Sequence, residues 1–132
     1  MGELEMELIR QILNYLNVNY IETTHEFRIY TPSFPNGGNK FFKIPFNKQF
    51  KFQLFFERQH SEDQYQQLIS IQNWLDENKD GSFPFGGGNG DMHRYIYLPE
   101  NTALAITENT VPAIQQLIKT QMENVEEAIR NI

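Results

Sequence analysis

The order in which hydrophobic periods follow one another constrains this chain more than any single motif. A helical period covers residues 3–17, and a period of two runs through the Phe-rich stretch from Tyr20 to Phe56. Helical spacing returns after Ser61, alternation returns over 92–98, and a last helical period begins near Thr110. The order α-βββ-α-β(β)-α predicts one α+β domain over residues 1–132, with an antiparallel sheet packed against helices.

Each predicted helix carries an apolar stripe and a recognisable end. In the first helix, apolar residues recur every four positions, and Asn17 marks the end of the pattern; these residues are Leu4, Leu8, Ile12 and Leu16. Ser61 is the predicted N-cap of the second helix, which ends within 76–81. Pro112 lies in the first turn of the last helix, where proline is tolerated.

The strands are defined by alternation of apolar and polar residues. The clearest strand spans 50–56, and only residues 47–49 separate it from an alternating run that ends at Phe46. So short a turn predicts that these two strands form an antiparallel hairpin. Pro45 cannot donate a ladder hydrogen bond, so it belongs near a strand end or an edge. Residues 83–85 read as a short strand, and residues 102–106 fit a strand or a helix equally.

Composition narrows the class of protein. The 132 residues contain no cysteine, and the formal net charge is −6. The start of the chain is acidic and lacks signal-peptide features, and no apolar run approaches the ~20 residues that span a bilayer. We therefore expect a cytoplasmic protein without a membrane segment. The negative charge disfavours nucleic acid as a partner, although six of the eleven basic residues fall between positions 28 and 58.

One segment resembles half of a calcium-binding loop. Asp76, Asn78 and Asp80 stand at alternate positions and Gly81 follows, as in the first six residues of such a loop. The twelfth position, which should supply a bidentate glutamate, is Gly87. The favoured interpretation is therefore a polar helix terminus with Gly81 near the C′ position, and no bound metal or other cofactor.

Other motifs with chemical meaning are incomplete. The Gly-rich run 86–90 lacks the Lys-Ser/Thr that completes a phosphate-binding loop. His25, His60 and His93 do not have the spacing of a zinc-binding helix. No Gly-x-Ser-x-Gly segment is present. These patterns favour a binding protein over an enzyme, and no residue is assigned a catalytic role.

The aromatic residues of the strands point to a binding surface. Five rings stand out of phase with the regular core positions of their strands: Tyr30, Phe41, Phe55, Tyr95 and Tyr97. If the helices pack on one face of the sheet, these rings lie on the other face, and a patch of exposed rings marks an interface. The alternative is a sheet that helices cover on both faces, with every ring in the core.

The element order resembles the type III secretion chaperone-like fold and the related bacterial sensory-transduction-regulator family. Residues 8–13, with the exit at 17–20, are similar to the family's opening helix, and residues 69–75 are similar to its second helix. The resemblance covers most of the chain and is topological. It implies a bacterial homodimer that binds a partner polypeptide on its sheet or along its helices.

The sequence therefore predicts a non-enzymatic, chaperone-like module that binds a polypeptide through its aromatic sheet. An extended client segment would pair with an edge strand while the rings supply side-chain pockets. One alternative is an immunity or inhibitor protein whose acidic helices neutralise a basic partner. A third is a metal-binding protein or enzyme that uses the 76–81 segment.

Overall fold

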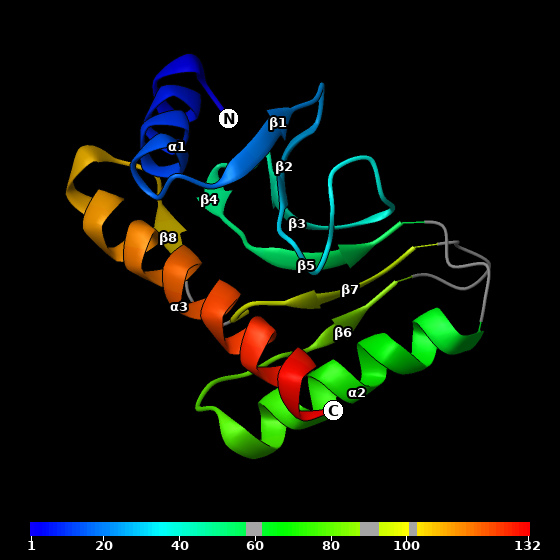
Figure 1. Cartoon of the computed structure of the whole chain (residues 1–132). Coiled ribbons are helices and arrows are strands. Elements are labelled where there is room, and N and C mark those ends of the chain that lie inside the picture. The colour runs from blue at the N-terminus through cyan, green and yellow to red at the C-terminus, as the bar shows by residue number, and fades with distance from the viewer. Residues whose placement is uncertain (58–61, 88–92, 101–102) are drawn as a thin grey trace.

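A computed structural model describes residues 1–57, 62–87, 93–100 and 103–132, with only the backbone of residues 62 and 63. Within these ranges, three α-helices and eight strands follow one another (Figure 1). The elements are α1 (Glu3–Tyr15), β1 (Asn19–Glu22), β2 (Glu26–Tyr30), β3 (Lys40–Pro45), β4 (Gln49–Phe50), β5 (Gln53–Phe56), α2 (Glu62–Asn78), β6 (Phe85–Gly86), β7 (Arg94–Tyr97), β8 (Leu104–Ala105), a 3-10 turn (Glu108–Thr110) and α3 (Val111–Asn131).

Six of the strands form one antiparallel sheet in the order β1-β2-β3-β5-β7-β6. The predicted hairpin is present, since β3 pairs with β5 and Lys40 lies opposite Phe56. Pro45 is the last residue of β3, at the strand end where a missing donor is tolerated. The strands β4 and β8 pair with each other as a separate two-stranded ribbon.

The helices cover one face of the six-stranded sheet. Buried residues from α1, α2 and α3 join one side of the strands in a single apolar cluster, and Figure 1 shows α3 passing across that side. The strand residues of this cluster alternate as the pleat requires; they are Phe27, Ile29, Phe42, Ile44, Leu54, Phe56 and Ile96. The α+β fold class predicted from the sequence is thus confirmed.

Two details of the strands differ from the prediction. The segment 19–30 is a hairpin of β1 and β2, because Thr23 reverses the chain by bonding to the backbone of Glu26. The strand predicted over 50–56 breaks at Lys51 and Phe52, where the chain leaves β8 and joins β3. The alternation of apolar and polar residues reveals neither the chain reversal at Thr23 nor the strand break at Lys51 and Phe52. The ambiguous segment 102–106 contains the short strand β8, and Ser61 lies outside the described residues.

One arginine joins α1 to the edge of the sheet. The guanidinium of Arg10 donates from Nε and Nη2 to the two carboxylate oxygens of Glu22, at 2.8 Å and 3.2 Å, and also bonds Glu3 and Glu7. These bonds, the one to Glu22 first, raise the pKa of Arg10 above its already high ordinary value. Arg10 and Glu22 are thus joined by two parallel hydrogen bonds, the bidentate geometry that guanidinium–carboxylate pairs prefer.

In the part of the chain that the structure describes, no helix combines the length and the apolar character required to cross a membrane.

Candidate functional site

The sheet face turned away from the helices, here called the outer face, carries a row of aromatic rings. Phe41 lies opposite Phe55, and Phe55 lies opposite Tyr95, so register places one ring on each of three neighbouring strands. Tyr30 extends the row onto β2, with its ring centroid 5.8 Å from that of Phe41. The Phe41–Phe55 and Phe55–Tyr95 centroids are 5.5 Å and 5.8 Å apart, and both pairs are stacked. We call Tyr30, Phe41, Phe55 and Tyr95 the aromatic row.

The row forms a second buried cluster, separate from the core beneath the helices. The predicted placement of these rings on the face opposite the helices is therefore correct. Their predicted exposure is wrong for three of them, since Tyr30, Phe41 and Phe55 keep only 5%, 0% and 8% of their surface in contact with solvent. Tyr95 and Tyr97 are half-buried.

Charged side chains of the same face lie over these rings. The guanidinium carbon of Arg28 is 4.5 Å from the centroid of Phe41, and Nζ of Lys43 is 4.1 Å from the centroid of Phe55. Both distances fit a cation held over the negative face of an aromatic ring. Arg28 and Lys43 lie opposite each other in register, so their cations stand side by side over the row.

The row ends at a glycine on the edge strand β6. Gly86 lies opposite Tyr95, and a Cβ built on Gly86 would overlap the tyrosine ring. The absence of a side chain at position 86 therefore lets the Tyr95 ring lie against the backbone of β6. His93 stacks on Phe55 with centroids 5.5 Å apart, and Tyr97 meets Tyr95 edge-on at 5.2 Å.

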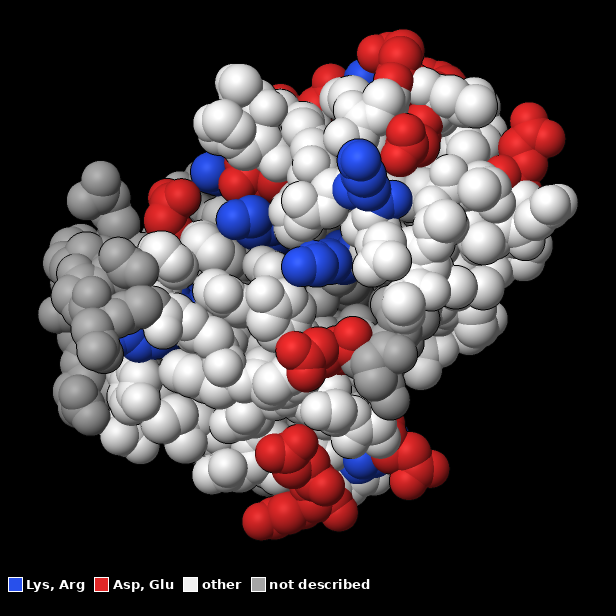
Figure 2. All heavy atoms as spheres, turned by 180° about the vertical axis from the view of Figure 1, so that it is seen from behind, with Lys and Arg blue, Asp and Glu red and all other residues white. Residues whose placement is uncertain are grey.

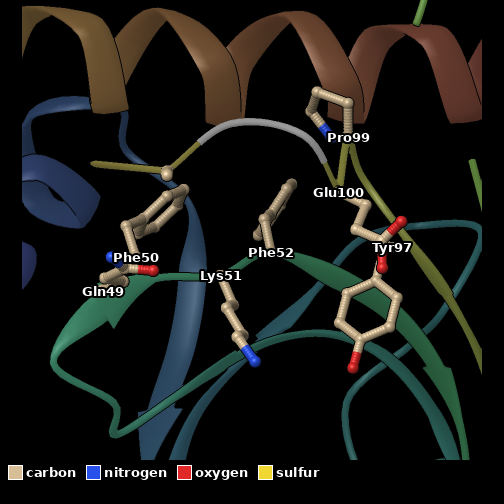
Figure 3. A pocket seen from close by; sticks show the side chains of 8 residues that line it. Gln49, Phe50, Lys51, Phe52, Tyr97, Pro99 and Glu100 are labelled. Carbon is tan, nitrogen blue, oxygen red and sulfur yellow. The ribbon is translucent and has the colours of Figure 1, made fainter. Parts of the chain in front are cut away.

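A small hollow adjoins the outer face at Tyr97. Its volume is about 110 Å³, and its lining combines aromatic, apolar and charged side chains: Gln49, Phe50, Lys51, Phe52, Tyr97, Pro99, Glu100 and Ala103. Figure 3 shows Phe50 and Phe52 directed toward α3, whereas Lys51 and Tyr97 point the opposite way. Nζ of Lys51 is 5.9 Å from the Tyr97 centroid, so a third cation accompanies the rings. The hollow is large enough for a small side chain of a partner.

Charge is unevenly distributed over the molecule. Seen from the side opposite α3, lysine and arginine side chains gather near the middle of the view, and acidic groups stand beside them and at the rim (Figure 2). The acidic neighbours of the cations are Glu26, which is 3.4 Å from Nζ of Lys43, and Glu57, which is 3.3 Å from Nη2 of Arg28. The outer face thus combines largely buried aromatic rings with cations on a protein whose net charge is negative.

The segment that resembles half of a calcium-binding loop forms the end of α2. The helix extends through Asn78, so Asp76 and Asn78 are helical, and Nδ2 of Asn78 donates to the Trp74 carbonyl. Lys79 pairs with Glu127 of α3 at 2.8 Å, and Gly81 has a φ of +121°. Asp80 is exposed beyond the helix. Across the described ranges, no three histidine or acidic side chains come together as a metal site.

The other motifs are placed only in part. His25 is exposed in the β1–β2 turn and His93 lies beside the aromatic row, while His60 is outside the described residues. Within the Gly-rich run, Gly86 belongs to β6 and Gly87 has a φ of +131°; residues 88–90 are also outside the described residues.

The sequence interpretation missed the cations that cover the rings. The sequence prediction assigns the basic residues between 28 and 58 to no face of the sheet, yet Arg28 has the strand parity of Tyr30, and Lys43 has that of Phe41. Parity was therefore a usable signal. Register, which sets Arg28 opposite Lys43, comes from the structure alone.

Comparison with known proteins adds no relative: no family model, curated protein or solved structure matches this chain.

Proposed function

We propose that this protein is a non-enzymatic, chaperone-like module that binds a partner polypeptide on the outer face of its sheet. The observation that carries the proposal is the aromatic row with two charged residues over it. Helices occupy the opposite face of the sheet. The charged side chains of Arg28 and Lys43 lie over rings of the row, and such a surface is suited to contact with another chain. Arginine and tyrosine are also among the residues that contribute most at protein interfaces.

The edge strand β1 supplies the backbone part of the proposed contact. It ends the sheet on one side, and three of its four residues, Asn19, Ile21 and Glu22, are exposed. Ile21 lies opposite Arg28 and has 41% of its surface exposed. An extended segment added beside β1 would pair through its main chain and place alternate side chains on the outer face.

The proposal includes a homodimer in the bacterial cytoplasm, as the resemblance to secretion chaperones implies. A groove on the helix side suits a contact between copies, since it combines apolar side chains with one charge of each sign; its lining is Leu16, Val18, Lys119, Met122 and Glu123. Tyr15, with 74% of its surface exposed, borders an adjoining depression. Light scattering on the purified chain measures this directly, and a monomer over the whole accessible concentration range contradicts the dimer.

The test of binding is a selection of peptides from a random library displayed on phage, with the purified protein as bait. The selected peptides should lose affinity for a Tyr95→Ser variant by at least tenfold, since Tyr95 is the part-exposed end of the row. Tyr15→Ser is the matched control, because it removes the same ring from the helix side. Retained folding of both variants is checked by circular dichroism.

Two results contradict the proposal. One is a library that yields no binder. The other is a set of binders that lose affinity for Tyr15→Ser and keep it for Tyr95→Ser, which would move the contact to the helix side and favour the inhibitor alternative.

A further inference from the structure

The guanidinium of Arg28 is held over a ring but lacks a full set of acceptors. It makes one hydrogen bond to a carboxylate, from Nη2 to Glu57 Oε2 at 3.3 Å. Its Nε is shielded from solvent, and none of the described residues accepts a hydrogen bond from it. A buried donor without an acceptor is costly, so an incoming acceptor at this position would be stabilised.

Arg10, in the same chain, makes the bidentate pair with a carboxylate that Arg28 lacks. Its Nε and Nη2 share the two oxygens of Glu22, whereas the nearest carboxylate oxygen to Nε of Arg28 is Oε2 of Glu26, at 3.9 Å. That distance is too long for a hydrogen bond. On the outer face, Nη2 of Arg28 therefore donates to a carboxylate, while its Nε donates to none of the described residues.

The local structure around Glu26 keeps its carboxylate from accepting a hydrogen bond from Nε of Arg28. Its Oε2 already accepts a close hydrogen bond from the Thr23 hydroxyl, in a turn that also joins the two backbones. Its Oε1 faces Nζ of Lys43 at 3.4 Å. Because the β1–β2 turn fixes Glu26 in this way, Glu26 does not supply the missing acceptor, and none of the other described residues supplies it.

We infer that the partner segment that binds the outer face is acidic, with carboxylates at alternate positions of an extended chain. This inference rests on the proposed function, because it names the chemistry of the polypeptide bound there. Arg28, Lys43 and Lys51 supply three cations against the carboxylates of Glu26 and Glu57. Alternate side chains of a strand lie on one side, roughly 7 Å apart, so an Asp/Glu-x-Asp/Glu segment can meet neighbouring cations.

The charge of the rest of the molecule favours this site over others for an acidic segment. The chain has a net charge of −6, and exposed carboxylates stand on the helices, among them Asp76, Glu77 and Glu123. These groups repel an acidic segment, which favours the cations of the outer face over the acidic helices. The carboxylate replaces Glu57 at Arg28 and adds the missing acceptor at Nε.

The experiment uses fluorescein-labelled synthetic peptides of alternating glutamate and threonine, with a glutamine–threonine peptide of the same length as neutral control. Fluorescence anisotropy at low salt should show the glutamate peptide binding at least tenfold more tightly, and the difference should fall as salt is added. Arg28→Gln and Lys43→Gln should each weaken its binding about tenfold or more. Arg130→Gln, an exposed arginine at the end of α3, should change nothing.

A variant expected to strengthen binding tests whether Arg28 recognises the peptide or only stabilises the fold. Glu57→Gln removes the internal carboxylate that competes for Arg28, so the glutamate peptide should bind several-fold more tightly to it. If Arg28 only held the fold together, this substitution would leave affinity unchanged or lower it. Circular dichroism and the unfolding midpoint show whether each variant stays folded.

Three results overturn the inference of an acidic partner, and each can be distinguished from a failure of the outer face to bind any polypeptide. Equal binding of the glutamate and glutamine peptides, both lost in Tyr95→Ser, removes the acidic partner and keeps the sheet as a binding surface. Absence of glutamate-peptide binding, with phage-selected neutral peptides still bound, has the same meaning. Tighter binding of oligodeoxythymidylate, in competition with the peptide, would make the ligand a phosphate chain.

Discussion

The two faces of the six-stranded sheet bury similar rings by different means. Phe42 points into the core, where its ring packs near Phe34 and Phe52 beneath the helices. Its neighbour Phe41 points the other way and lies between Tyr30, Phe55 and the guanidinium of Arg28. Both rings are fully buried, but Phe42 belongs to the core beneath the helices and Phe41 belongs to the separate cluster of the outer face.

This difference separates permanent from displaceable burial. A helix that covers a ring leaves only when the domain unfolds, whereas an arginine or lysine side chain rotates about single bonds within nanoseconds. A sheet with one face of each kind has a stable core and an apolar surface that a partner can uncover.

Phe42→Ala should produce the largest loss of stability. It removes a fully buried ring from the centre of the core and leaves a cavity that the helices and strands cannot close. The expected loss is about 3–5 kcal/mol in the free energy of unfolding, measured by urea denaturation and circular dichroism. A loss below about 1 kcal/mol would mean that the helix-covered face is not the main core.

Phe41→Ala should cost roughly half as much, about 2 kcal/mol, although Phe41 is just as buried. Water and the Arg28 side chain can fill the space that the ring leaves, so the residual cavity is smaller. The matched comparison is Phe42→Ala, its neighbour on the opposite face. Equal losses for the two variants would show that the outer face is an ordinary core, and the idea of displaceable burial would fail.

The order of helices and strands was predictable because it depends on local periodicity. Alternation also assigned Tyr30, Phe41 and Phe55 to one face, since parity is a property of each strand alone. Exposure was not predictable, because the cover of Phe41 is Arg28, thirteen positions away in sequence and on another strand. The break at Lys51 was equally hidden, since the pairing of β4 with β8 depends on residues 104–105.

Gly86→Ala should have an intermediate effect, about 1–2 kcal/mol, concentrated at the edge of the outer face. The added Cβ would overlap the Tyr95 ring, which must rotate away from β6 and disrupt its stack on Phe55. The reason is steric, so removing the ring removes the penalty. In a double-mutant cycle, Tyr95→Ala should cancel most of the cost of Gly86→Ala.

Strict additivity in that cycle would contradict the geometry of the edge. It would place the cost of Gly86→Ala in the backbone of β6 rather than in contact with the tyrosine. Near-ultraviolet circular dichroism gives a second readout, since it reports the packing of tyrosine side chains directly. The spectrum of Gly86→Ala should resemble that of Tyr95→Ala in this region.

The smallest predicted effect concerns Lys40, which is the first residue of β3 and reaches toward α2. Its Nζ donates to Gln67 Oε1 at 2.7 Å and lies 5.0 Å from the Phe56 centroid, and burial lowers the pKa of Lys40 below its ordinary value of 10.5. When pH rises through this lowered pKa toward 10.5, the folded lysine releases its proton before the unfolded one does. The desolvation cost, present in full at lower pH, is then relieved, and the free energy of unfolding rises.

The measurement is urea denaturation of the natural chain and of Lys40→Met between about pH 8 and pH 10. The difference between their free energies of unfolding isolates the contribution of Lys40, because the other titrating groups contribute equally to both proteins. The methionine keeps the apolar stem beside Phe56 and removes the charge. Stability of the natural chain relative to Lys40→Met should increase with pH over this range. A difference that falls with pH would mean that the bond to Gln67 favours the charged lysine more than burial opposes it, reversing the assigned cause.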